Sequence, residues 1–296
     1  MKKKVSIFNF SGIYKNESFY HIDKSSSIYG METSSFRDVS SHDRKMLHEL
    51  GCARRESFAS DILSCAIEKE ILEIDCSDIP GTNCMCDDAA RESIRSIIEK
   101  NSVGSDEIHF IDSGNYHYMS AILLEKVQTP FSLVVLDHHP DMQAPMFGDI
   151  LSCGGWVLDV IEKNEYVRDI HVIGADLSLI AALEEKDRNR GHFYEISDIF
   201  LPESIALPQT QFPVYLSIDK DVLSRDEIIT NWDQGEMSFE QMKLFVEKVL
   251  DSGDVVGIDI CGECAPDQEE IDIESAILKN DQVNQELLEL ITICEM

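Results

Sequence analysis

The chain has 296 residues, 43% hydrophobic and 27% charged, which is enough apolar material for a substantial folded core. Lys and Arg number 25 against 56 Asp and Glu, a formal net charge of −31. This negative field repels phosphate backbones and anionic lipid headgroups, so we expect no nucleic-acid partner and no membrane partner. Nine cysteines in a chain of this size favour a reducing compartment, and we expect a cytoplasmic protein.

The first 104 residues carry the least certain pattern. The apolar residues at the start, up to Phe10, predict a first strand. Residues 25–43 are rich in serine and predict a long loop, whereas residues 59–73 have helical spacing. A second helix is expected at residues 89–100, where two aspartates precede it and suit its N-terminal dipole.

From about residue 105 onward, short β-branched segments alternate with segments of helical period. Strands are predicted at residues 107–112, 131–139, 169–176, 214–221 and 255–263. A helix is predicted after Ser238, whose spacing to Gln241 is that of a capping box. The alternation is typical of βα units wound into a mostly parallel sheet. We find no repeat and no dividing linker, so we expect one domain over residues 1–296.

The strand predicted at 131–139 ends in Asp137-His-His-Pro-Asp141. Side chains at positions i, i+2 and i+4 of a strand point the same way. Asp137, His139 and Asp141 can therefore face one pocket, whereas His138 points to the other side.

Two further strand ends carry similar residues. Asp219 and Asp221 lie two apart and hence on one face, and His117 lies just beyond the strand predicted at 107–112. Ligands gather at the carboxyl ends of parallel strands. Any one aspartate there can be a loop cap, but so many buried charges together cost several kcal/mol per ion unless a cation is present. Two histidines and four aspartates are typical of a binuclear hydrolytic site, with cations about 3.5–4 Å apart.

Four segments carry a resemblance to a known family: Gly114-Asn-Tyr-His, Asp137-His-His-Pro-Asp, Ser217-Ile-Asp-Lys-Asp and Asp259-Ile-Cys-Gly-Glu. In order and spacing they resemble the signature segments of the arginase family of ureohydrolases, which includes agmatinases and formimidoylglutamases. The resemblance spans about residues 105–270. It implies an arginase-like fold, a three-layer α/β/α sandwich with a mostly parallel central sheet. It also implies a homo-oligomer and a small guanidino or amidino substrate.

The resemblance further implies a site with two Mn²⁺, other divalent metals being possible. It assigns six ligands: His117 and Asp141 to one metal, His139 and Asp221 to the other, and Asp137 and Asp219 as bridges. A hydroxide between the metals would attack the sp² carbon of the substrate. Asp141 would accept the proton and pass it to the departing amine. Glu263 would hold the guanidinium, because a carboxylate accepts paired N–H donors.

The chain also departs from the family pattern. Trp156 stands where arginases carry a histidine thought to shuttle protons, which leaves open a protein that keeps the fold and binds metal and ligand without turnover. Trp156 could form an apolar or cation–π wall for a substrate, or simply pack. Trp232 and Asp233 lie in a loop after the Asp219 strand and are weaker candidates for substrate contact. Asp176, at another strand end, could accept a substrate amine or cap a helix.

Other motifs point elsewhere. Asp137-His-His also resembles the triplet of the DHH phosphoesterases, which use two manganese ions. That family places an Asp-x-Asp motif upstream, whereas Asp219-Lys-Asp lies downstream here. Cys261-Gly-Glu-Cys has the spacing of a redox or zinc motif, and Cys84-Met-Cys could be a soft ligand pair, but we expect structural thiols.

Overall fold

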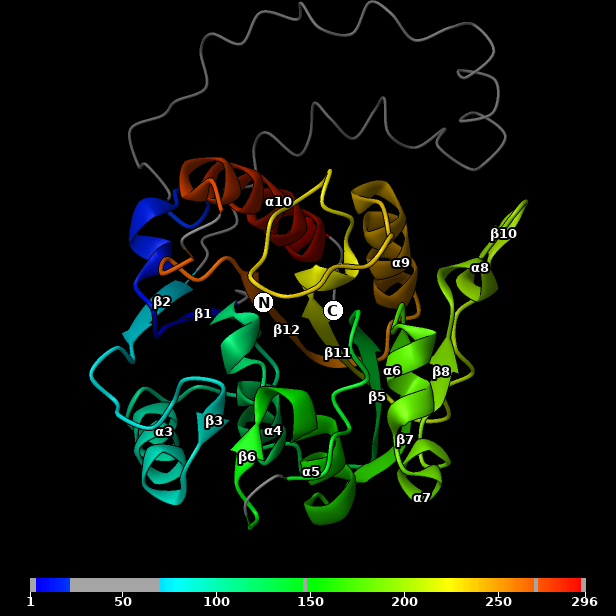
Figure 1. Cartoon of the computed structure of the whole chain (residues 1–296), viewed down its shortest axis with the longest axis horizontal. Helices are drawn as coiled ribbons and strands as arrows, with labels where there is room; N and C mark the ends of the chain where they lie inside the picture. Colours follow the sequence, from blue (N-terminus) through cyan, green and yellow to red (C-terminus); the bar gives the residue numbers. More distant parts are fainter. Residues whose placement is uncertain (1–3, 22–69, 146–147, 269–270, 294–296) are drawn as a thin grey trace, which may run out of the picture. The chain divides into compact units, whose positions relative to one another are not determined.

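The computed structural model describes residues 4–21, 70–145, 148–268 and 271–293 (Figure 1). The helices and strands below belong to one compact unit. The loop predicted at 25–43 and the first part of the helix predicted at 59–73 lie outside the described residues. The single domain over residues 1–296 stays a prediction.

Eight strands form one sheet, and their described pairings are all parallel. In spatial order the strands are β2 (Glu70–Asp75), β1 (Lys4–Asn9), β4 (Ile108–Ser113), β12 (Val255–Glu263), β11 (Val214–Asp219), β5 (Phe131–Leu136), β7 (Val167–Ile173) and β8 (His192–Tyr194). Two antiparallel pairs lie outside this sheet: β3 (Met85–Cys86) with β6 (Leu151–Ser152), and β9 (Phe200–Leu201) with β10 (Ser204–Ile205).

Helices cover both faces of the sheet. One face carries α3 (Asp88–Lys100), α4 (Met119–Leu124) and α5 (Trp156–Lys163), and the other carries α9 (Phe239–Asp251) and α10 (Ile273–Ile293), as Figure 1 shows. Strand residues alternate between the two cores: Leu133 and Val135 join the first, Val134 and Leu136 the second. The predicted three-layer α/β/α sandwich is therefore confirmed.

Shorter elements complete the part of the chain that the structure describes. They are α6 (Leu177–Ala182), α7 (Glu185–Arg188), α8 (Ile196–Ile199), and the 3₁₀ turns η1 (Ile13–Asn16), η4 (Gly114–Tyr116), η5 (Cys153–Gly155) and η6 (Lys220–Val222). Two of these turns, η4 and η6, directly follow strands β4 and β11. None of the described helices has the length and apolar character needed to cross a bilayer.

Local sequence signals account for the helix starts. The Ser238 hydroxyl accepts from the Gln241 amide at 3.2 Å, and the Gln241 side chain accepts from the Ser238 amide at 3.0 Å. The predicted capping box of α9 is therefore confirmed. The Asp87 side chain accepts from the Ala90 amide at 2.8 Å and caps α3, one of the two aspartates expected at that helix start.

Some predicted boundaries are wrong. Residues 70–73 lie in strand β2 rather than in a helix, because pairing with β1 overrides the local helical spacing. The strands predicted at 131–139 and 214–221 end earlier, at Leu136 and Asp219. Pro140 cannot donate to a ladder, and η6 turns the chain directly after β11. Helix α10 is not predicted.

Candidate metal centre

The polar residues gather where β4, β5 and β11 end. His117 follows η4, Asp137 to Asp141 form the segment after β5, and Asp219 and Asp221 lie at the end of β11 and in η6. Within the sheet β11 is flanked by β5 and β12, and β12 separates it from β4. The structure thus brings the six predicted ligand side chains to one edge of the sheet.

His117 stands at the centre of the first group. Its Nδ1 atom lies 3.2 Å from Asp137 Oδ2, 3.1 Å from Asp141 Oδ2 and 3.3 Å from Asp219 Oδ2. None of these contacts has hydrogen-bond geometry, and Nδ1 is buried without a hydrogen-bond partner in the described part of the chain. A ring nitrogen that faces three carboxylate oxygens in this way is placed to share a cation with them.

A buried relay fixes the ring of His117. Its Nε2 lies 2.9 Å from Ser217 Oγ, and the Ser217 hydroxyl donates to Asp259 Oδ1 at 2.6 Å. Because Ser217 has one proton and gives it to Asp259, its oxygen accepts from Nε2–H of His117. The neutral ring therefore leaves the Nδ1 lone pair toward the carboxylates, which is the orientation that a metal ligand needs.

The second group consists of Asp137, His139 and Asp221. His139 Nδ1 lies 2.9 Å from Asp221 Oδ2 and 3.4 Å from Asp137 Oδ1. Backbone amides hold the carboxylates in place: His139 N–H donates to Asp137 at 2.6 Å, and His138 N–H donates to Asp221 at 3.0 Å. Asp137 belongs to both groups and is placed to bridge two cations.

The electrostatics of the cluster favour added positive charge. Burial, followed by the charge of Asp137, raises the pKa of Asp141 to about 7. Burial lowers the pKa of His139, but its contacts with Asp137 and Asp221 outweigh this and raise it to about 12. Burial also opposes a charge on His117, yet Cys261 and the three carboxylates raise the pKa of His117 well above its ordinary value.

A metal cation supplies the positive charge that this cluster favours better than a proton does. An added proton on His117 would sit on Nδ1, where no carboxylate accepts it in hydrogen-bond geometry. Metal ions impose no such donor angle, and carboxylate oxygens with imidazole nitrogens suit Mn²⁺ and other first-row divalent ions. The residues present therefore fit a divalent metal centre.

A cavity of roughly 210 Å³ opens onto this cluster. Its wall contains five of the six predicted ligands and Trp232, together with Gly114, Gln143 and the segments around Met85 and Cys153. The Trp232 indole donates to Asn115 Oδ1 at 3.0 Å, which fixes the ring at the wall. Of the predicted substrate contacts, the structure brings Trp232 to this cavity.

The other predicted substrate residues lie elsewhere. Trp156 is fully buried and donates from Nε1 to Asp141 Oδ2 at 2.8 Å, so it stands behind the site and orients the Asp141 carboxylate. Asp176 and Asp233 line a neighbouring groove of roughly 1020 Å³, together with His138. Asp176 also caps α6 by accepting from the Ser178 amide at 2.8 Å.

Glu263 is directed away from the cavity. It is buried, bonds to the ammonium of Lys220, and accepts from Asn284 Nδ2 of α10 at 2.7 Å. Gly262, with φ of 98°, precedes it and interrupts the strand alternation. Glu263 therefore lies with Lys220 rather than with Asp219, and its predicted contact with a guanidinium stays a prediction.

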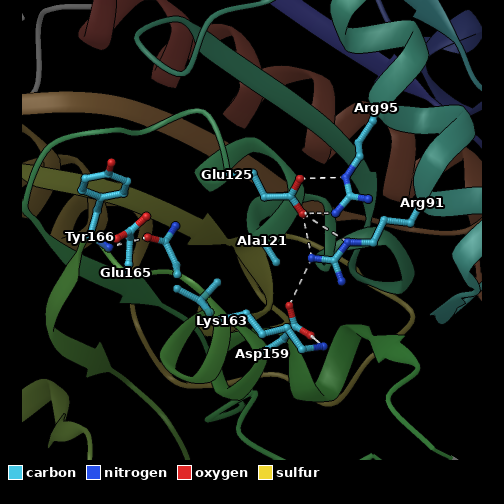
Figure 2. Close-up of a pocket in the computed structure, with 10 residues that line it drawn as sticks. Arg91, Arg95, Ala121, Glu125, Asp159, Lys163, Glu165 and Tyr166 are labelled. Atoms are coloured by element: carbon cyan, nitrogen blue, oxygen red, sulfur yellow. Dashed lines mark hydrogen bonds and ion pairs between the residues drawn. The ribbon is translucent and has the colours of Figure 1, made fainter.

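A second cavity, between α3, α4 and α5, contains no such cluster. Figure 2 shows two of its acidic residues, Glu125 and Asp159, paired with basic side chains. Glu125 accepts from Arg91 at 2.7 Å and from Arg95 at 2.8 Å, and Asp159 accepts from Lys163 at 2.5 Å. These groups neutralise each other across the helix surfaces. The cavity is therefore best explained as a gap between packed helices whose side chains form structural ion pairs.

Three buried residues of the centre are absent from the predicted set: Asp259, the hydroxyl of Ser217, and Cys261. Cys261 Sγ lies 3.0 Å from Asp219 Oδ2. The alternation of β11 places Ser217 on the face of Asp219, and that of β12 places Cys261 on the face of Asp259. Strand periodicity could therefore have predicted from the sequence that Ser217 and Cys261 face the centre.

Fold and site together define an α/β protein with a candidate binuclear metal centre at the carboxyl edge of a parallel sheet. No family model matches the chain. An uncharacterized protein of Thermotoga maritima is 33% identical over 159 residues, which cover 54% of this chain and 59% of that relative.

Solved structures show that the fold is that of the arginases and other ureohydrolases. Formimidoylglutamase from Bacillus subtilis superposes with a TM-score of 0.59 at 12% identity, covering 99% of this chain and 88% of that one. Agmatine ureohydrolase of Thermoplasma volcanium gives a TM-score of 0.56 at 14% identity over 100% and 92%. A triple mutant of an arginase-like protein of T. brucei, bound with Mn²⁺, gives 0.55 at 12% over 99% and 92%.

Proposed function

We propose that the protein is a metal-dependent hydrolase that cleaves a C–N bond in a small linear guanidino or amidino compound. The observation that carries this proposal is His117 Nδ1, held by the Ser217 relay and facing three carboxylates. The names of the structural neighbours support the substrate class, and one neighbour is bound with Mn²⁺. Two Mn²⁺ ions are the proposed cofactors, and a homo-oligomer and the cytoplasm stay predictions.

The residues divide between two cation positions. His117 and Asp141 would hold one cation, His139 and Asp221 the other, and the carboxylates of Asp137 and Asp219 would contact both. When bound, two such cations make a water nucleophilic near neutral pH and polarise the substrate. The chain contributes the fixed carboxylates, since backbone amides hold Asp137 and Asp221 before any metal arrives.

The cavity suits a planar cation. Its floor is carboxylate, and Trp232 presents a ring 5.8 Å from that of His139, so a guanidinium can lie between charge and aromatic surface. Asp141, oriented by Trp156, is the proposed group that takes the proton of the attacking water and returns it to the departing amine. A guanidinium contact with Glu263 would require that carboxylate to leave Lys220.

The position of Glu263 also favours a second candidate function. With Glu263 bonded to Lys220 and Trp156 buried where arginases carry a histidine, the chain can hold metal and ligand without turnover. Such a protein would bind two cations and release neither urea nor amine. The arginase-like fold, by contrast, gives no support to a DHH phosphoesterase.

The test begins with metal content. Protein purified without chelator is incubated with Mn²⁺, desalted, and assayed for manganese per chain by plasma mass spectrometry. We expect about two equivalents in the wild type and a clear loss in Asp137→Asn, because this carboxylate belongs to both ligand groups. Asp251→Asn, an exposed carboxylate at the end of α9, is the matched control and should retain the metal.

Activity is then measured on the loaded protein. A panel of guanidino and amidino compounds is screened for release of urea, ammonia or amine, and Asp137→Asn should abolish any turnover found. Two bound metals without turnover on the panel would favour the binding protein. Failure to retain metal in the wild type would remove the basis of both candidates.

A further inference from the structure

Cys261 lies against the first cation position. It is on β12, is fully buried, and its Sγ lies 3.0 Å from Asp219 Oδ2. Among the described residues, Cys261, His117 and Asp219 form one of three groups whose donor atoms lie within 4.8 Å of one another. The six ligands suggested by the sequence motifs do not include this thiol.

The backbone holds the thiol at this place. Cys261 is the register partner of Asp219 on the neighbouring strand, so both side chains project from the same face of the sheet. The next residue, Gly262, has φ of 98°, and a Cβ there would lie 2.5 Å from Asp219 Oδ1 and 2.7 Å from the Lys220 amide. Glycine therefore permits the close approach of β12 that sets the thiol beside the carboxylate.

We propose that Cys261 is a thiolate ligand of the cation held by His117 and Asp219, and that this position prefers a softer divalent ion than its neighbour. The inference rests on the proposed metal centre. As the bond from Sγ to the metal forms, the thiol proton leaves to solvent and no electron is transferred.

The two positions then differ in chemistry. The group of His139, Asp137 and Asp221 offers nitrogen and carboxylate oxygen, which suit Mn²⁺. A thiolate added to the His117 position favours Zn²⁺, Co²⁺ or Fe²⁺, because soft ligands select softer ions. One centre could thus bind two different metals. The competing explanation is that Cys261 stays protonated and only donates to Asp219.

Cobalt separates these explanations. Metal-free protein is titrated with Co²⁺ while cobalt per chain and the absorption spectrum are recorded. A thiolate bound to cobalt gives an intense charge-transfer band in the near ultraviolet, whereas nitrogen and oxygen ligands give weak visible bands. We expect the band in the wild type and in Cys264→Ser, and its loss in Cys261→Ser. Cys264 is the matched control, since it is also buried and contacts the Ala265 carbonyl at 3.8 Å.

A competition experiment gives the second readout. Wild type and Cys261→Ser are equilibrated with equal Zn²⁺ and Mn²⁺, desalted, and analysed for both metals. Zn²⁺ binds most nitrogen and oxygen sites more tightly than Mn²⁺, so the readout is the difference between the two proteins. We expect the ratio of bound zinc to bound manganese to fall by about tenfold or more in Cys261→Ser. Circular dichroism of the variant confirms that it is folded.

The outcomes are distinct. Two bound cobalt ions without a charge-transfer band, or a band that persists in Cys261→Ser, would overturn the inference and leave the proposed metal centre intact. Failure of the wild type to bind cobalt or manganese would overturn both. A band lost only in Cys261→Ser, with a shifted zinc preference, supports the thiolate ligand.

Discussion

The tautomer of His117 depends on a serine that touches no cation position. Ser217 accepts from His117 Nε2 and donates to Asp259, and both partners are buried. Such outer contacts fix the ring orientation and the free lone pair of a ligating histidine. We therefore expect the metal affinity of the candidate centre to depend partly on side chains behind the predicted ligands.

Ser217→Ala tests this at the scale of one hydroxyl. The change removes the acceptor of His117 Nε2 and leaves Asp259 without its 2.6 Å donor. We expect the affinity for Mn²⁺ to fall by about 10–100-fold, measured by isothermal titration calorimetry. The ring would no longer be restricted to the orientation that presents Nδ1.

Ser132→Ala is the matched control. Ser132 is also a fully buried serine, but its hydroxyl has no hydrogen-bond partner among the described residues. Its removal should leave metal affinity unchanged, because no contact with the centre is lost. Equal affinities for the Ser217 and Ser132 variants would show that the relay does not orient the ligand.

The residue types of the centre follow from sequence more readily than its outer contacts do. Asp219 and Asp221 stand two apart after an apolar strand, which predicts a shared direction. The relay from His117 through Ser217 to Asp259 links residues separated by 100 and 42 positions. Such contacts depend on which strands become neighbours, and the order of strands in the sheet is not encoded in local periodicity.

At the scale of elements, the turn η6 directs the consecutive side chains of Asp219, Lys220 and Asp221 to different places. Asp219 and Asp221 turn toward the cation positions, while Lys220 between them is fully buried and bonds to Glu263, Asn280 and Asn284. The last two residues lie on α10. This lysine therefore ties the turn that carries two predicted ligands to α10, which covers the sheet face opposite α3, α4 and α5.

Glu263→Gln tests this tie. Removing the carboxylate breaks the ion pair of the buried Lys220 ammonium and leaves the nearby Glu17 as a carboxyl neighbour. Breaking one partner of a buried pair typically costs about 3–5 kcal/mol. We expect a loss near the lower end of that range, since two asparagine oxygens still accept from Lys220. Urea unfolding followed by circular dichroism gives the free energy.

The double variant Lys220→Met with Glu263→Gln provides the control. It removes the unpaired charge, so it should be more stable than Glu263→Gln alone. If Glu263 instead holds a substrate guanidinium, Glu263→Gln would raise KM while the free energy of unfolding stayed at the wild-type value. The two measurements therefore separate a structural pair from a substrate contact.

Elements with strong local signals are predicted well, and those decided by neighbours are not. The start of α9 follows from Ser238 and Gln241, whose side chains and amides bond reciprocally. Strand β2 is an edge strand with helical spacing, and only its pairing with β1 makes it a strand. The direction of Glu263 depends on the positive φ of Gly262, a conformation that strand periodicity does not reveal.

At the scale of the whole molecule, charge is the dominant feature. A formal net charge of −31 opposes compaction through self-repulsion, and four of the acidic groups are the buried aspartates among the predicted ligands. The fold must therefore tolerate two kinds of repulsion. Surface repulsion is reduced by salt, whereas repulsion within the buried cluster is reduced by bound cations.

These two contributions can be measured separately. The Debye length falls from about 30 Å at 0.01 M salt to about 8 Å at 0.15 M, so NaCl should raise the Tm of metal-free protein. Mn²⁺ at 100 times its Kd should add about 2.7 kcal/mol to the free energy of unfolding, because it binds the folded state. Thermal unfolding of wild type and Asp137→Asn, with NaCl alone and with Mn²⁺ alone, provides the comparison.

Asp137→Asn should keep the increase in Tm with NaCl, since the surface is unchanged, and lose the increase with Mn²⁺. An increase with Mn²⁺ that survives in Asp137→Asn would place the stabilising metal outside the centre, and a Tm that does not rise with NaCl would show that surface repulsion does not limit the fold.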